Sequence, residues 1–306
     1  MKIFKNLLRL ATDKQLRFFG LASRTIYRKT SDEEYLKKSY KVVFGKELNL
    51  ASPKTFSEKM EWLKLNDRKE IYTVMVDKYR MKEFVTSKIG EGHVVPLIGA
   101  FDSPDEIDFE TLPNQFVLKC NHNQHKGMYI CKDKNKLTKK EIKRIKKNLT
   151  KGLAQDFYLT HREWPYKNVK RKIIAEQFMK ENSRPEADCL VDYKWFCFNG
   201  VPKLMYIGTD ASSHPTCDWF DMDFNFVDMR NRDPNSLTPP SKPAEFEEMR
   251  QFAGKLSQGT KFLRVDFYLI DGEVYVGELT FFPCGGECLF RPEEANLRLG
   301  GLIHLD

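Results

Sequence analysis

The chain has 306 residues, of which 41% are hydrophobic and 31% are charged, and its formal net charge is +8. This composition is typical of a folded protein with a substantial core and excludes a disordered chain. No apolar run approaches the roughly 20 residues of a membrane span, and the positive charge favours an anionic partner. The seven cysteines are odd in number and include no C-x-x-C pair, which indicates reduced thiols in a cytosolic protein.

The first 29 residues, MKIFKNLLRLATDKQLRFFGLASRTIYRK, are basic. Charges interrupt each apolar cluster, so the stretch lacks the core of a signal peptide. It predicts an amphipathic helix that contacts an anionic membrane at the inner face. A helix packed on the main domain, with its basic face in solvent, is the alternative.

Residues 1–70 predict an N-terminal helical segment. Capping-box spacing occurs twice before amphipathic runs, at Ser31–Glu34 and at Thr55–Glu58. The run YTVMVDKYRMKEFV, residues 72–85, also has helical periodicity and predicts a further helix.

Two short strands are expected next, at His93–Pro96 and at Phe116–Cys120. The second strand places Lys119 near its end, and a polar loop, Gly127 and another strand follow. An ammonium group beside a loop rich in hydrogen-bond donors is suited to hold phosphates. An ordinary strand-end lysine is the alternative.

A lysine-rich helix is predicted after Thr138, which forms a capping box with Glu141. Its apolar stripe contains Ile142, Ile145 and Leu149. No aromatic side chains interleave with the lysines to stack on bases, so we expect a solvated face and no nucleic-acid partner.

The character of the chain changes to β after Lys172. The strand KIIAEQF ends near Glu176, whose carboxylate could meet an adenine amino group or simply lie at a strand end. The next stretch, DYKWFCFNGVPKLMYIG, predicts a hairpin around Asn199-Gly200. It carries Lys194, which could contact a phosphate or an acidic substrate, or pair with Asp192.

The segment FLRVDFYLIDGEVYVGELTFFPCGGE, residues 262–287, predicts a second hairpin. Side chains alternate faces along a strand, so the odd positions, including Tyr275, should face the core. The polar side chains of the even positions then share the other face: Arg264, Asp266, Tyr268, Glu278 and Thr280. A strict two-residue turn would break this parity, so we expect a three-residue loop with Gly272 at positive φ.

Two carboxylates on one face of this hairpin have two interpretations. Asp266 and Glu278 can be oxygen ligands for Mg²⁺, which usually binds one or two carboxylates together with substrate phosphates. In the alternative, the hairpin face is half-solvated and Arg264 neutralises its acidic neighbours.

The ordered set Asp77-Lys78, LPNQFVLKC, KIIAEQF, DYKWFCFNG, RVDFY and GELTFFPCGG resembles the ATP-grasp superfamily. More closely, it is similar to the TupA-like branch, associated with teichuronopeptide and polysaccharide biosynthesis. The resemblance runs from about Asp32 to the C-terminus.

The resemblance implies an α+β, ATP-grasp fold in which two α+β subdomains clamp a nucleotide. The ATP-grasp domain would cover residues 71–306, with subdomains at about 115–190 and 191–306. It also implies roles for several residues. Lys78 and Lys119 would contact the ATP phosphates, Glu176, Gln177 and Phe178 the adenine edge, and Asp266 and Glu278 the Mg²⁺. Thr280 stands where many ATP-grasp enzymes carry an asparagine that completes the metal shell, and its hydroxyl would be a weaker metal ligand than an amide oxygen.

The chemistry that the resemblance implies is acid–amine ligation. A substrate carboxylate attacks the γ-phosphate of ATP, and an amine then displaces phosphate from the acyl phosphate. Arg264 and Lys194 are the candidate catalytic residues. The partners would be an acidic sugar or glycan, such as a hexuronic acid, and an amine in surface-polysaccharide assembly.

Two other functions remain open from the sequence. Asp221-Met222-Asp223 matches the D-x-D pattern of metal-dependent glycosyltransferases, although the same residues can form a turn. A noncatalytic adaptor that binds anions or membranes through the basic N-terminus is the third possibility.

Overall fold

The computed structural model describes residues 14–22, 27–124, 126–182, 189–209, 215–231 and 233–305. Most of the basic N-terminal stretch lies outside these residues. Its contact with a membrane therefore stays a prediction.

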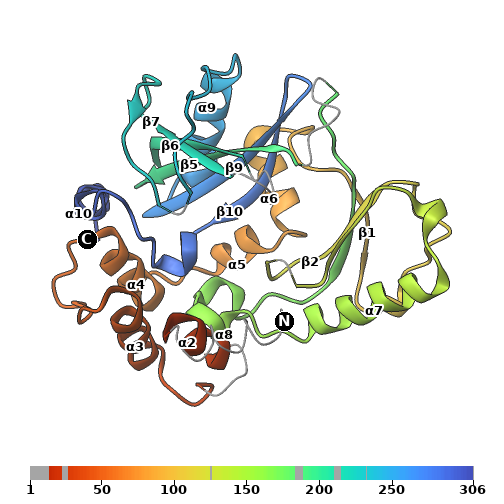
Figure 1. The fold of residues 1–306 in the computed structure, drawn as a ribbon, viewed down its shortest axis with the longest axis horizontal. Coiled ribbons are helices and arrows are strands. Elements are labelled where there is room, and N and C mark those ends of the chain that lie inside the picture. The colour runs from red at the N-terminus through yellow and green to blue at the C-terminus, as the bar shows by residue number, and fades with distance from the viewer. Residues whose placement is uncertain are drawn as a thin grey trace.

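Two antiparallel sheets form the framework of the molecule (Figure 1). The small sheet has the strand order β1-β4-β2-β3, with bounds Leu97–Phe101, Ile173–Gln177, Phe116–Cys120 and Met128–Cys131. The large sheet has the order β10-β9-β5-β6-β7-β8, with bounds Glu273–Thr280, Phe262–Ile270, Val191–Phe198, Val201–Thr209, Thr216–Phe220 and Phe226–Val227.

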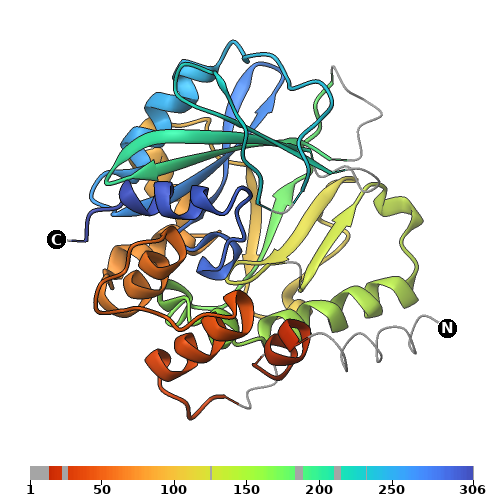
Figure 2. The same cartoon turned by 60° about the vertical axis from the view of Figure 1, so that its left-hand side comes forward.

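Helices cover the sheets and extend the molecule on one side (Figure 2). Helix α7 packs on β2 and β3, α9 packs on β5, β6 and β9, and α4 lies against α10. The described α-helices are α2 (Lys14–Ala22), α3 (Asp32–Phe44), α4 (Phe56–Asn66), α5 (Glu70–Val76), α6 (Met81–Ile89), α7 (Lys139–Leu153), α8 (Tyr158–His161), α9 (Phe246–Ser257) and α10 (Glu294–Gly301). Short 3₁₀ helices are η1 (Pro104–Glu106), η2 (Lys134–Lys136), η3 (Trp164–Tyr166) and η4 (Pro283–Gly286).

The predicted helix starts are present. Thr55 and Thr138 each form a complete capping box with the glutamate three residues later. Ser31 accepts a hydrogen bond from the backbone of Glu34 as the N-cap of α3. These caps satisfy backbone N–H groups that the first helical turn leaves free.

The helix predicted over residues 72–85 is interrupted, which corrects that prediction. Helix α5 ends at Val76 and α6 begins at Met81. The Asp77 carboxylate accepts hydrogen bonds from the backbone N–H groups of Tyr79 and Arg80, at 2.9 and 3.4 Å. An aspartate that binds nearby backbone groups in this way competes with the helix and starts a turn.

The strand predicted at His93–Pro96 is also wrong. Val94 makes only an isolated bridge with Val276, and β1 begins at Leu97. The expected strands at residues 116–120 and 172–178 are present as β2 and β4. The hairpin around Asn199-Gly200 joins β5 to β6, with both turn residues at positive φ.

The second hairpin has the predicted faces but a different connection. Asp271 and Gly272 form a two-residue turn, with φ of 53° and 84°, and Glu273 pairs with Ile270. The three-residue loop was therefore a wrong prediction. Tyr275 pairs with Tyr268 on the polar face, so its expected core position was wrong as well.

A β-bulge restores the parity of this hairpin. The register shifts between Val276 and Glu278, so Gly277 is the extra residue and Glu278 lies directly opposite Asp266. A Cβ atom at Gly277 would lie 2.7 Å from the ring atom Cε2 of Tyr268. Glycine is therefore required for the close packing of the bulge against this ring.

Three further observations concern the whole chain. Among the described residues, no helix is both long enough and apolar enough to cross a bilayer. All seven cysteines are free thiols. The predicted subdomain boundaries stay a prediction, and the small sheet also includes β1, which precedes residue 115.

Candidate active site

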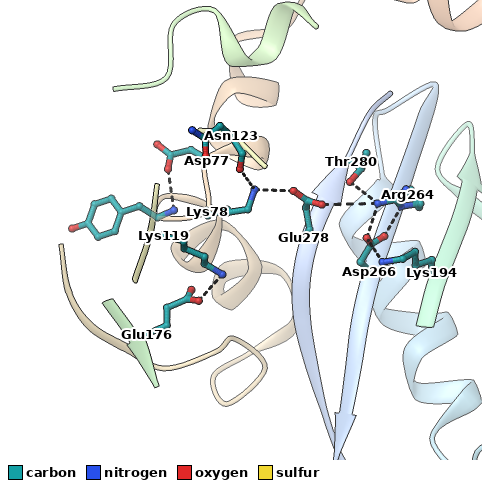
Figure 3. A network of polar contacts seen from close by, with 11 residues as sticks. Asp77, Lys78, Lys119, Asn123, Glu176, Lys194, Arg264, Asp266, Glu278 and Thr280 are labelled. Carbon is teal, nitrogen blue, oxygen red and sulfur yellow. Dashed lines mark hydrogen bonds and ion pairs between the residues drawn. The ribbon is translucent and has the colours of Figure 1, made fainter. Parts of the chain in front are cut away.

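The register of the large sheet places one row of charged side chains across three strands. Lys194 on β5 and Glu278 on β10 lie on either side of Asp266 on β9. Directly paired residues of an antiparallel sheet share a face, so these three groups adjoin one another. The neighbouring row contains Arg264 opposite Thr280. Figure 3 shows this arrangement.

Asp266 is the centre of the row. Arg264 donates to both of its oxygens, with Nε–Oδ1 and Nη2–Oδ2 distances of 2.6 and 2.7 Å. Lys194 Nζ lies 3.0 Å from Asp266 Oδ2 and 3.0 Å from Asp192 Oδ2. The alternatives of a salt bridge for Arg264 and a pairing of Lys194 with Asp192 are therefore both present in the structure.

Lys78, in the segment between α5 and α6, links that segment to the hairpin of β9 and β10. The break between α5 and α6 frees Lys78 from helical geometry, and its backbone N–H donates to the carbonyl of Asn121 at 3.0 Å. Its Nζ atom lies 2.8 Å from Glu278 Oε1 and 3.2 Å from the carbonyl oxygen of Asn123. The interruption of the helix thus positions a candidate phosphate-binding lysine.

We call Lys78, Lys194, Arg264, Asp266 and Glu278 the hairpin network. It contains three cations and two carboxylates. Burial alone would raise the pKa of Glu278, but Lys78 and Arg264 lower it to about 2. Burial lowers the pKa of Lys194, but Asp266 and Asp192 raise it above its usual value. Both shifts favour the charged forms of Glu278 and Lys194.

Facing the hairpin network, the small sheet carries a second set of charges. Glu176 lies inside β4, not after it as predicted, and is 4% exposed. Its carboxylate binds Lys119 Nζ at 2.5 Å and Lys82 Nζ at 2.6 Å. Burial raises the pKa of Glu176, but these two lysines lower it below its usual value.

Sequence reasoning missed Lys82. It lies on α6, donates to the carbonyl of Val95 at 2.5 Å, and reaches Glu176 only because α6 packs near the end of the small sheet. In the sequence, only its position four residues after Lys78 pointed to Lys82, and this spacing does not by itself indicate that the two lysines belong to one site.

An exposed apolar surface surrounds Lys119 and Glu176. Met128 pairs with Lys119, Ile130 with Val117, and Leu97 with Glu176, so all share one face of the small sheet. Met128, Ile130 and Leu97 are 39%, 45% and 40% exposed. Such side chains provide a flat apolar surface suitable for a planar base. Met128 and Ile130 are two residues apart in β3, which was the signal that they share a face.

Gln177 is the last residue of β4 and Phe178 follows it; because Gln177 pairs with Phe116, its side chain lies on the face opposite Glu176. The backbone N–H of Gln177 donates to the carbonyl of Pro96 at 3.0 Å, and its side chain is exposed. Phe178 is half-buried. Their assignment to an adenine edge stays a prediction.

The hairpin carboxylates fit the requirements of Mg²⁺. Asp266 and Glu278 are hard oxygen ligands placed side by side, and Lys78, Lys194 and Arg264 now occupy the same oxygens as positive partners. No group of three or more metal-ligating side chains occurs among the described residues. Two carboxylates are sufficient where substrate phosphates complete the shell.

Thr280 has a different set of contacts. Its hydroxyl accepts a hydrogen bond from Arg264 Nη2 at 3.2 Å, and the side chain is buried. This contact orients the guanidinium group toward Asp266. The role of Thr280 as a metal ligand stays a prediction.

A second charged group lies deeper, behind the end of β10. Lys64 Nζ donates to both oxygens of Glu61, at 2.8 and 2.9 Å, and to the carbonyl of Gly285 at 2.6 Å. Glu287 accepts from the Ser39 hydroxyl at 2.5 Å. Sequence reasoning missed this group because its members come from three distant segments.

We call Glu61, Lys64, His161, Glu163 and Glu287 the Lys64 cluster. Burial raises the pKa of Glu61 and of Glu163 to about 8, and Lys64 only partly opposes this. Burial and the nearby Lys64 lower the pKa of His161 to about 3. The cluster thus holds three carboxyl groups around one lysine.

Asp221 forms its own turn. Its Oδ1 atom accepts from the backbone N–H groups of Asp223 and Asn225 at 2.9 and 2.8 Å, and its Oδ2 from the Asn225 side chain at 3.0 Å. Asp223 is exposed. The turn interpretation of the D-x-D motif therefore accounts for the contacts of Asp221.

Several solved structures are similar to this chain. The D-alanine–D-alanine ligase from Bacillus anthracis, complexed with ATP, is 16% identical with a TM-score of 0.40, covering 68% of this chain and 54% of the ligase. The corresponding Helicobacter pylori enzyme is 15% identical with a TM-score of 0.43, covering 81% and 69%. Phosphoribosylamine–glycine ligase from Thermotoga maritima is 16% identical with a TM-score of 0.38, covering 69% and 48%.

The chain thus spans about half the length of the first of these ligases. Among curated proteins, none matches it. The family model of TupA-like ATP-grasp proteins, however, matches residues 58–304, which include both sheets and the hairpin network. This match confirms the predicted family and its α+β, ATP-grasp fold: the chain belongs to the TupA-like ATP-grasp family.

Proposed function

We propose that this protein is an ATP- and Mg²⁺-dependent ligase that joins a carboxylate to an amine. The observation that carries the proposal is the row of Lys194, Asp266 and Glu278, with Lys78 bound to its outer end. Phosphoryl transfer is catalysed mainly by positioning and by neutralising charge, and this row supplies both in fixed geometry. Membership of an ATP-grasp family supports the same class of reaction.

The lysines would bind the phosphates of ATP. Lys78 and Lys119 are each paired with one carboxylate, Glu278 and Glu176 respectively. A polyphosphate that enters between them can replace these pairings with charge-assisted hydrogen bonds. The apolar face that includes Met128 and Ile130 would receive the base.

Asp266 and Glu278 would hold Mg²⁺, which when bound neutralises phosphate charge and orients the transferred phosphoryl group. Arg264 lies beside both carboxylates, 2.6 Å from Asp266 Oδ1 and 3.9 Å from Glu278 Oε2. Its planar fork suits a substrate carboxylate and the acyl phosphate that follows. Lys194 would hold the Asp266 side chain in place.

The substrate carboxylate attacks the γ-phosphate, forming an acyl phosphate and ADP. The amine then attacks the acyl carbon, the amide bond forms, and phosphate leaves. A hexuronic acid of a surface polysaccharide is the acid that we propose, coupled to an amino acid or another amine. The family's association with polysaccharide biosynthesis supports this choice.

The test combines turnover with product identification. The protein is incubated with ATP, Mg²⁺ and a panel of hexuronates and amines, and ADP release and amide mass are measured. We expect ADP only when both substrates and Mg²⁺ are present. ADP release without an amide product would contradict the acid–amine assignment.

Two variants separate this function from the D-x-D alternative. The double variant Asp266→Asn, Glu278→Gln should lose turnover, and full turnover would refute the assignment of these residues. Asp223→Asn is the matched control, because it removes an exposed carboxylate whose loss leaves the Asp221 turn bonds in place. Loss of function in Asp223→Asn, together with stabilisation by a UDP-sugar and not by ATP, would favour a glycosyltransferase.

A further inference from the structure

The outer face of the small sheet has a hollow that the proposed reaction does not use. It has a volume of about 390 Å³. Its lining side chains come from β3 and α7: Tyr129, Arg144, Ile145, Lys147, Asn148 and Lys151. Tyr129 pairs with Leu118, one residue before Lys119, and therefore lies on the opposite face from Lys119. Figure 2 shows α7 lying along this outer face.

The hollow is positively charged, and its cations form no ion pairs in the described residues. Within the part of the chain that the structure describes, Arg144, Lys147 and Lys151 make no ion pair, whereas Lys146 on the same helix binds Asp105 at 3.4 Å. The nearby acid Glu141 is held by the backbone and hydroxyl groups of Thr138. Three free cations around one hollow favour an anionic ligand.

The remaining lining groups suit a sugar. Tyr129 presents an aromatic ring, and Asn148 donates one N–H to the carbonyl of Met128 at 3.2 Å, which leaves its amide oxygen to accept from a hydroxyl group. Arg144 offers the planar fork that matches a carboxylate. The volume is within the range of about 300–1,000 Å³ that small-ligand pockets usually have.

The hollow is built on a close contact between helix and sheet. Gly152 of α7 lies against Gly127 of the loop before β3, and a Cβ atom on Gly152 would approach the Gly127 Cα to 2.6 Å. The contact fixes the C-terminal end of α7, which carries Lys151, against β3. The side chains of Arg144, Lys147 and Lys151 are exposed and lie at the rim of the hollow.

A membrane or a nucleic acid is a poorer match. None of the large hydrophobic side chains exposed in the described residues belongs to α7, so the helix offers nothing to insert into a bilayer. Tyr129 is the single aromatic side chain of the hollow, whereas nucleic-acid surfaces stack successive bases.

We infer that this hollow binds a carboxylate-bearing sugar chain at a site separate from the catalytic one. Such a chain is held on the face of the small sheet opposite Lys119. The inference uses only the α7–β3 surface, so it stands or falls independently of the proposed ligase reaction.

The test titrates the full-length protein with tetragalacturonate and, as the neutral probe, maltotetraose, by isothermal titration calorimetry. We expect tetragalacturonate to bind at least about tenfold more tightly, because hydrogen bonds to charged groups contribute more than neutral ones. The triple variant Arg144→Gln, Lys147→Gln, Lys151→Gln should lose at least about tenfold in this affinity.

The matched control is Lys139→Gln, Lys140→Gln, Lys143→Gln, which removes the same charge from exposed positions of the same helix outside the hollow. It should change the affinity by less than about twofold. Equal losses in both triple variants would overturn the inference and indicate general attraction to a basic helix.

Two further measurements complete the test. Tyr129→Phe should retain binding and Tyr129→Leu should weaken it several-fold, because only the former keeps the ring. Stronger binding of phosphatidylglycerol vesicles or single-stranded DNA than of tetragalacturonate would assign the surface to a membrane or a nucleic acid instead. Absence of ATP turnover on small free substrates would refute the ligase proposal and leave this binding result unaffected.

Discussion

The two charged groups of this protein, the hairpin network and the Lys64 cluster, have opposite charge balance. The hairpin network has three cations for two carboxylates, and Glu278 and Lys78 are 20% and 12% exposed. The Lys64 cluster has three carboxyl groups for one lysine, and Glu61 and Lys64 are 0% and 1% exposed. A surplus of accessible cations suits an anionic ligand, whereas carboxyl groups kept from water are held by protonation and internal bonds.

The contacts explain this difference in role. In the hairpin network the pairs are carried by rigid neighbouring strands, and a ligand can take over each partner. In the Lys64 cluster, Lys64 uses its three N–H groups on Glu61 and Gly285, joining α4 to the loop after β10. We therefore expect changes in the first group to affect catalysis and changes in the second to affect stability.

The largest expected loss of unfolding free energy follows from replacement of the buried Lys64. Lys64→Met leaves the Glu61 carboxyl and the Gly285 carbonyl without their donor, and removal of one partner of a buried pair costs about 3–5 kcal/mol. Urea unfolding monitored by circular dichroism measures this loss. Lys37→Met is the control, because Lys37 forms an exposed pair with Glu33 whose loss costs about 1 kcal/mol or less. Equal losses in both variants would contradict a structural role for the Lys64 cluster.

Changes in the hairpin network should lower turnover strongly and unfolding free energy only slightly. Arg264→Lys keeps the charge but loses the fork that binds both oxygens of Asp266. Turnover of ATP should fall by about 10²-fold, as expected for loss of a charge-stabilising donor, with a small change in unfolding free energy. Parallel measurements of ADP release and of urea unfolding test the contrast. If Arg264→Lys unfolds readily but retains its turnover per folded molecule, Arg264 acts in stability and not in catalysis, contrary to this prediction.

The bulge that aligns the hairpin network gives a third comparison. In Gly277→Ala the new methyl group meets the Tyr268 ring, 2.7 Å from Cε2, and overpacking of this kind costs about 1–3 kcal/mol. Because Glu278 follows directly, turnover should fall as well. Gly254→Ala in α9 is the control, since its new Cβ would make only ordinary contacts of 3.7 Å or more and should stabilise the helix slightly. If both variants behave like wild type, the bulge does not control the register.

A further comparison distinguishes the two groups by the pH dependence of stability. Burial raises the pKa of Glu163 from 4.5 to about 8, so the folded state holds a proton that the unfolded state has lost. The contribution of Glu163 to stability is therefore complete below pH 4.5 and is lost as the pH rises through 8. Glu163→Gln should remain more constant in unfolding free energy than wild type between pH 5 and 8.

Glu278 should affect stability at acidic pH. Its pKa of about 2 lies below the usual 4.5, because Lys78 and Arg264 outweigh the effect of burial. Its contribution is present above pH 4.5 and is lost as the pH falls toward 2. Glu278→Gln should therefore change only the acid side of the stability profile. Superimposable pH profiles for the Glu163 and Glu278 variants would show that the two groups do not differ in this way.

Much of the local structure was predictable. Capping boxes marked the starts of α4 and α7, and Asn199-Gly200 and Asp271-Gly272 marked two turns. These features depend on residues a few positions apart, where side-chain and backbone preferences act directly. The ordered motifs were also sufficient to identify the family, which the match over residues 58–304 confirms.

The candidate site was predictable only in part. The period of two along a strand grouped Asp266, Glu278 and Arg264 on one face, as the structure shows. The sequence could not show how the parity is kept, because the bulge at Gly277 depends on the packing of Tyr268 from the opposite strand. A choice between a longer loop and a bulge requires the contacts of both strands.

By itself, then, the sequence determined the capped helix starts, the positions of the two hairpin turns and the face shared by Arg264, Asp266 and Glu278, since these follow from local preferences and periodicity. Tertiary structure alone decided which charges from distant segments meet. Lys78 reaches Glu278 across 200 positions of the chain, and Lys64 reaches Gly285 across 221. Ion pairs of this kind depend on how the helices and sheets pack, and no local pattern in the sequence records that packing.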